Sequence, residues 1–149
     1  MMSENSNIKI TRLCLPAELD HLSVFLDHIR EIAQTAGLAE AQISRLELAM
    51  EEALVNVFNY AYEGRTHAGT VFCQVTIQAG GLTVDIVDDG PPFDPLARTD
   101  PDTSLELDER QPGGLGILLI KSLIDEVSYH REDGRNVLSL RITQAVHEG

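Results

Sequence analysis

The segment that most constrains this chain is residues 39–62, which the sequence predicts to be a helix with apolar side chains on nearly every face. We expect such a helix to be buried. It nevertheless carries Glu52 and Asn56, whose spacing of four residues places both side chains on one face, about one turn apart. Burying a carboxylate or an amide costs on the order of several kcal/mol unless a partner satisfies it.

The residues alone leave two explanations of this pair open. Glu52 and Asn56 either cap or cross-link neighbouring backbone, or they face a metal-bound nucleotide. In the second case the amide oxygen of Asn56 suits Mg²⁺, and Glu52 is placed to accept a proton from a hydroxyl or water. Asn59 is next on that face. The adjacent Glu51 leaves open which carboxylate points inward, although the spacing to Asn56 favours Glu52.

The rest of the chain carries both helical and extended patterns. The 149 residues fit one domain, 1–149. Gly37 is placed to end the first helix, and an Ala-Gly-Gly turn separates the second and third strands. We expect helices over residues 17–36 and 115–124, and strands over residues 7–15, 70–78, 82–87, 126–130 and 136–143.

The composition excludes several classes of protein. A net charge of −13 with no Lys/Arg cluster argues against nucleic acid as a direct partner. The N-terminal residues do not resemble a secretory signal, and no apolar run approaches the roughly 20 residues that span a bilayer. We therefore expect a cytoplasmic protein without membrane attachment. Cys14 and Cys73 have no metal or redox spacing and are expected to be buried free thiols.

Two glycine-containing motifs flank a long proline-rich loop. Asp88-Asp89-Gly90 follows a strand, so it puts carboxylates where a backbone turn can approach a ligand. Gly113-Gly114-Leu115-Gly116 opens a helix, where free backbone N–H groups suit phosphates. Taken singly, the first motif is also explained as an ordinary turn and the second as a connector. Their order along the chain is more informative than either alone.

Together, EALVN on the helix, DDG after a strand and GGLGI after the loop resemble the N, G1 and G2 boxes of the GHKL ATPases. Within that superfamily the chain is most similar to the bacterial anti-sigma factor serine kinases. The resemblance implies an α+β fold of the Bergerat ATP-binding type: a two-layer α/β sandwich whose mixed, mainly antiparallel sheet has helices packed on one face. Residues 91–114 would be the ATP lid.

The resemblance also implies roles for individual residues. Glu52 would be the general base, Asn56 the Mg²⁺ ligand, Asp88 the adenine contact and Gly90 the turn residue beside it. Arg110, favoured over Arg98 in the lid, would neutralise charge on the transferred phosphate. The G1 box departs from the DxGxG form, because Pro91-Pro92 replaces the second glycine. Further nucleotide contacts would come from Asn59, Gly114, Leu115 and Gly116.

The family reaction transfers the γ-phosphate of ATP to a serine of a STAS-domain anti-anti-sigma protein, with a sigma factor as the competing partner and a homodimer as the usual assembly. Our leading hypothesis is therefore an ATP- and Mg²⁺-dependent serine protein kinase that is also an anti-sigma factor. The alternative is a non-catalytic ATP-binding anti-sigma or adaptor protein. A third hypothesis treats the helix pair and the glycines as structural.

Overall fold

The computed structural model describes residues 8–61, 69–92 and 114–143, and within these it leaves the side chains of residues 60–61 and 114–117 undescribed. The described residues form a five-stranded sheet in the order β1-β2-β3-β5-β4, and each of its four strand pairings is antiparallel. β5, the last described strand in the chain, therefore lies between β3 and β4. The strands are β1 (Lys9–Pro16), β2 (Thr70–Gln78), β3 (Gly81–Asp88), β4 (Glu126–Glu132) and β5 (Arg135–Thr143).

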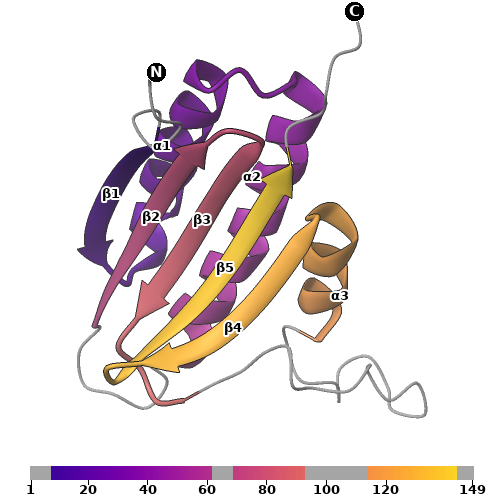
Figure 1. Ribbon diagram of the computed structural model, residues 1–149. Helices are drawn as coiled ribbons and strands as arrows, with labels where there is room; N and C mark the ends of the chain where they lie inside the picture. The colour runs from indigo at the N-terminus through magenta and orange to yellow at the C-terminus, as the bar shows by residue number, and fades with distance from the viewer. Residues whose placement is uncertain (1–7, 62–68, 93–113, 144–149) are drawn as a thin grey trace, which may run out of the picture.

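The three α-helices of the described residues lie on one face of the sheet, behind it in Figure 1. α2 packs against α1 on one side and against α3 on the other. A short 3₁₀ turn precedes α1, and a π-helical stretch, η3, continues α2. The helical segments are η2 (Leu19–His21), α1 (Leu22–Thr35), α2 (Glu40–Asn56), η3 (Val57–Ala61) and α3 (Gly114–Leu123). The predicted α+β fold with helices on one face is confirmed, although no described pairing is parallel.

The core lies between the helices and the sheet. Because side chains alternate between the two faces of a strand, one set of strand residues faces the helices and is almost fully buried. On β2 and β3 this set includes Val71, Cys73, Val75, Val84 and Ile86, each at most 1% exposed. Phe25, Leu46 and Leu54 of the helices are also fully buried. We call the other side, on which no described helix packs, the open face.

The α1–α2 connection follows the sequence prediction. Gly37 has a φ of 90°, which suits a glycine at a helix C-terminus, and the N–H of Leu38 donates to the carbonyl of Ala33. The Arg30 guanidinium also donates to both carboxylate oxygens of Glu47, at 2.9 and 2.6 Å, tying the two helices together. The helix stop and the helix pair are thus both encoded locally.

α2 is less uniformly buried than predicted. Its buried residues form one stripe facing the sheet, whereas Leu48 is 42% exposed and Glu51 is exposed. The expectation of a helix buried on nearly every face is therefore wrong. Its outer side remains open to solvent because α1 and α3 pack beside α2 and no described segment covers it.

The two cysteines lie on opposite faces. Cys73 is buried, and burial raises the pKa of its thiol to about 12. Cys14 is a free thiol too, but it is exposed, so the expectation that it is buried is wrong. The reason is strand register: Leu13 pairs with Cys73 and shares its face, which puts Cys14 on the open face.

Candidate functional site

Three of the motif-bearing segments meet at one end of the fold. α2 ends, β3 ends and α3 begins toward the lower end of the molecule in Figure 1. α2 also packs directly against α3. The topology therefore brings the predicted N box, G1 box and G2 box to the same end of the sheet, although they are far apart in the sequence.

Glu52 and Asn56 lie on the last two turns of α2, and both are half-buried. Glu51 is exposed, so of the two adjacent carboxylates Glu52 is the more enclosed. The pair is thus partly accessible, a position suited to contact with a bound molecule. Because both side chains are only half-buried, leaving them without a partner costs less free energy than it would for fully buried ones. Burial alone therefore does not require a bound ligand at Glu52 and Asn56.

The helix changes its winding immediately after Asn56. Residues 57–61 form a π-helix, a rare form that occurs most often as single turns at functional sites. Because a π-helix has more residues in each turn than an α-helix, a spacing of three no longer repeats the same face. Asn59 is exposed. Its predicted nucleotide contact stays a prediction.

Asp88 ends β3 and is only 5% exposed. Its Oδ1 accepts two hydrogen bonds of 2.9 Å each, one from the backbone N–H of Gly90 and one from the side-chain amide of Asn136. Burial raises the pKa of Asp88 above its ordinary value, while these two hydrogen bonds act in the opposite direction. Both described bonds fall on one oxygen, which leaves Oδ2 as an acceptor for a donor group.

Gly90 and the prolines after it are held by the β4–β5 hairpin. Gly90 is buried, and its carbonyl accepts a 2.7 Å hydrogen bond from the guanidinium of Arg131. The carbonyl of Pro91 accepts a 2.9 Å bond from the Asn136 amide. The turn that lacks a second glycine is therefore fixed through its carbonyl groups.

Asn136 and Arg131 are two residues of this site that were not predicted from the sequence. Asn136 is 4% exposed and lies directly across from Asp88 in the β3–β5 register. A polar residue at the start of a strand that is otherwise apolar on alternate positions was the available signal. Its partner was not deducible without knowing that β5 inserts beside β3.

The remaining predicted residues are only partly described. Gly114, Leu115 and Gly116 form the first turn of α3, so their backbone is placed at the predicted helix start. The side chain of Leu115 is outside the described part of the chain, as are Arg98, Arg110 and most of the predicted lid, 91–114.

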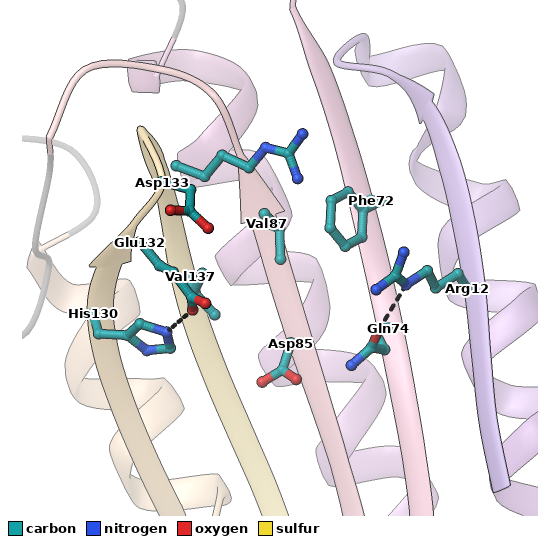
Figure 2. Close-up of a pocket in the computed structure, with 10 residues that line it drawn as sticks. Arg12, Phe72, Gln74, Asp85, Val87, His130, Glu132, Asp133 and Val137 are labelled. Carbon is teal, nitrogen blue, oxygen red and sulfur yellow. Dashed lines mark hydrogen bonds and ion pairs between the residues drawn. The ribbon is translucent and has the colours of Figure 1, made fainter.

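A separate hollow of about 280 Å³ lies on the open face (Figure 2). Arg12 donates to Gln74 at 2.7 Å and stands 5.2 Å from the Phe72 ring centroid, and Arg135 stands 5.7 Å from the same centroid. Asp85 accepts a hydrogen bond from Ser139. None of the residues predicted for the nucleotide site lines this hollow.

The sequence is similar to a known protein family over most of its length. Residues 15–142 match the family described as "Histidine kinase-like ATPase domain". The match covers most of the chain and includes the ends of α2 and β3 and the start of α3. The chain therefore belongs to the histidine kinase-like ATPase family.

Its similar curated relatives narrow this assignment. A "Serine-protein kinase RsbW" of Listeria monocytogenes is 31% identical over 134 residues, covering 87% of this chain and 84% of the relative. The protein of that name from Staphylococcus aureus is 28% identical over 124 residues, covering 80% and 78%. Within the family, the chain belongs with the RsbW serine-protein kinases, which confirms the resemblance to anti-sigma factor kinases.

Solved structures agree on the fold. The crystal structure of the RsbU and RsbW domains of Rv1364c from Mycobacterium tuberculosis superposes with a TM-score of 0.66 at 14% identity, covering 91% of this chain and 32% of the mycobacterial one. The histidine kinase domain of the blue-light activated kinase EL346 from Erythrobacter litoralis gives 0.51 at 18% identity, covering 83% and 61%. Both likenesses concern architecture alone.

Proposed function

We propose that this chain is an ATP-dependent serine protein kinase and anti-sigma factor that phosphorylates a STAS-domain anti-anti-sigma protein. The observation that carries the proposal is the buried Asp88 at the end of β3, with both described hydrogen bonds on Oδ1. Oδ2 suits an exocyclic amine such as that of adenine. Membership of the serine-protein kinase family supplies the reaction class.

Each of the proposed site residues would have a separate role in the reaction. The Asn56 side-chain oxygen would hold Mg²⁺, an ion that takes few protein ligands and keeps several waters. Within the described residues no cluster of three His, Cys, Asp or Glu side chains could hold a metal, which is compatible with such a sparse site. ATP and Mg²⁺, when bound, supply the phosphoryl group and neutralise its charge.

Glu52 would accept the proton of the target serine. As the serine oxygen bonds to the γ-phosphorus, the bond from that phosphorus to the β–γ bridging oxygen breaks and ADP leaves with its electron pair. The backbone N–H groups at the start of α3, around Gly114 and Gly116, suit phosphate oxygens. Arg110, outside the described residues, and Leu115 and Asn59 complete the proposed contacts.

The proposed partners are those implied by the resemblance to the anti-sigma factor serine kinases. They are a STAS-domain protein as substrate, a sigma factor as competitor and a second copy of the chain in a homodimer, all in the cytoplasm. No described helix has the length and apolar character needed to cross a membrane.

The direct test is transfer of the γ-phosphate of labelled ATP, with Mg²⁺, to the STAS protein. We expect Glu52→Gln to reduce transfer by roughly 10²-fold or more, the usual contribution of a positioned base, while ATP affinity changes little. Glu51→Gln is the matched control, because Glu51 is the adjacent, exposed carboxylate. Equal transfer by wild type and Glu52→Gln would remove Glu52 from the mechanism, and tight ATP binding without transfer would favour the non-catalytic adaptor.

A further inference from the structure

The β4–β5 hairpin places three hydrogen-bonded side chains next to Asp88, and none of them has a role in the proposed reaction. We infer that Asn136, braced by Tyr129 and Arg131, is a positioning residue that fixes the Asp88 carboxylate and thereby sets the preference for a purine with a 6-amino group. This inference rests on the proposed nucleotide site and names what determines its base specificity.

The hydrogen bonds of Asn136 determine which way its amide faces. Arg131 can only donate, and it lies 3.1 Å from Oδ1 of Asn136. The Tyr129 hydroxyl also donates to that oxygen. The Nδ2 end is therefore directed to the two acceptors on the other side, Oδ1 of Asp88 and the carbonyl of Pro91, each at 2.9 Å.

Burial makes this arrangement restrictive. Asp88 and Asn136 are 5% and 4% exposed, so neither side chain can readily exchange its partner for water. With Oδ1 of Asp88 occupied by Asn136 and Gly90, rotation of the carboxylate would break two buried hydrogen bonds. Oδ2 is thus held in one place as an acceptor.

Arg131 couples the carboxylate to the turn that follows it. Its Nη1 atom contacts both the Gly90 carbonyl and Oδ1 of Asn136, at 2.7 and 3.1 Å. The hairpin therefore holds the Asp88 side chain and the backbone of the Gly90 turn as one unit. A fixed carboxylate oxygen favours a ligand amine, and it repels the carbonyl oxygen that guanine carries at the same position.

Removing the Asn136 amide should therefore cost affinity only for a base that uses Oδ2. The experiment measures dissociation constants of the full chain, with Mg²⁺, for ATP and for purine riboside triphosphate, which lacks the 6-amino group. For wild type we expect a preference for ATP of roughly tenfold or more, as for a hydrogen bond to a charged group. In Asn136→Ala we expect this ratio to fall to about twofold, with the affinity for purine riboside triphosphate nearly unchanged.

Ser139→Ala is the matched control. Ser139 also lies on β5 and donates to an aspartate directly across on β3, but on the open face. It should retain the full preference for ATP. Tyr129→Phe keeps the ring and removes one hydrogen bond to Asn136, so it should lower the preference partially. If a thermal melt shows that Asn136→Ala is unfolded, Tyr129→Phe replaces it as the test variant.

The outcomes separate the two claims. Wild type that binds neither nucleotide overturns the proposed function and this inference with it. Wild type that prefers ATP, together with folded Asn136→Ala that keeps the preference or loses affinity for both nucleotides equally, overturns the inference alone. When Asn136→Ala is unfolded, an unchanged preference in Tyr129→Phe overturns it.

Discussion

β3 carries two aspartates on opposite faces of the sheet, Asp85 within the strand and Asp88 at its end. Each accepts a hydrogen bond from the β5 residue directly across from it, Ser139 for Asp85 and Asn136 for Asp88. The Asp85–Ser139 pair lies half-buried on the open face, whereas the Asp88–Asn136 pair is almost fully enclosed. The same residue type and the same pairing therefore give a surface contact on one face and a fixed acceptor on the other.

The charges around the two aspartates also differ. Asp85 shares its hollow with Arg12, Arg135 and other charged side chains that water can reach (Figure 2). Around Asp88 the partners are mostly neutral donors, with Arg131 contributing from the edge of the site. Enclosure by neutral donors, more than the carboxylate itself, distinguishes the candidate site.

The largest expected difference between the faces is in packing. Ile86 is 1% exposed beneath the helices, so Ile86→Ala should lower the free energy of unfolding by about 2–5 kcal/mol. Ile10 on the open face of β1 is 59% exposed, and Ile10→Ala should change it by no more than about 0.5 kcal/mol. Urea unfolding measures both. If the loss in free energy of unfolding caused by Ile10→Ala grows with protein concentration, the open face is covered in the predicted homodimer.

The next effect is on nucleotide affinity. Asp88→Ala removes the proposed acceptor for the adenine amine, so we expect ATP binding to weaken by about 1.5–3 kcal/mol, or roughly 10- to 150-fold. Asp85→Ala removes the equivalent carboxylate from the open face and should leave ATP affinity within about twofold. Isothermal titration calorimetry with Mg²⁺ gives both values. Equal losses for the two variants would mean that the face of the sheet does not decide which aspartate binds.

The smallest effect is on the pH dependence of stability. Burial raises the pKa of Asp88, so the unfolded chain releases this proton at a lower pH than the folded chain. The stability of wild type relative to Asp88→Asn should therefore be greatest below the ordinary aspartate pKa of about 3.9 and should fall as the pH rises through the folded pKa. Urea unfolding at a series of pH values measures it.

Salt distinguishes the causes of that raised pKa. Burial is the larger cause and repulsion from Asp89 a smaller one. Because salt screens exposed charges but not burial, the pH dependence should persist in about 0.5 M NaCl. Its disappearance in salt would identify charge repulsion as the main cause instead.

Much of the fold follows from local patterns in the sequence. The strand predicted over 70–78 has those bounds in the structure, and Gly37 ends α1 as expected. The two-residue turn at Asp133 and Gly134, both with positive φ, suits the short connection between the strands predicted over residues 126–130 and 136–143. These features depend on the residues within a few positions, so the sequence alone is sufficient to predict them.

The site was predictable only in part, because some of it depends on strand order. Asp88 follows from its place after a strand, but Asn136 lies 48 positions further along the chain. Its role depends on β5 inserting between β3 and β4, which no local pattern specifies. The exposure of Leu48 and Cys14 likewise depends on which neighbouring elements cover α2 and β1.

The position of β5 between β3 and β4 affects how the protein folds during its synthesis. Until residues 135–143 leave the ribosome, β3 has an unpaired edge and Asp88 lacks its amide partner. Gln42 at the start of α2 likewise bonds the carbonyl of Thr143, 101 positions away. The early part of the chain therefore cannot complete its fold ahead of the late part, and the proposed nucleotide site becomes complete only after the β4–β5 hairpin is translated.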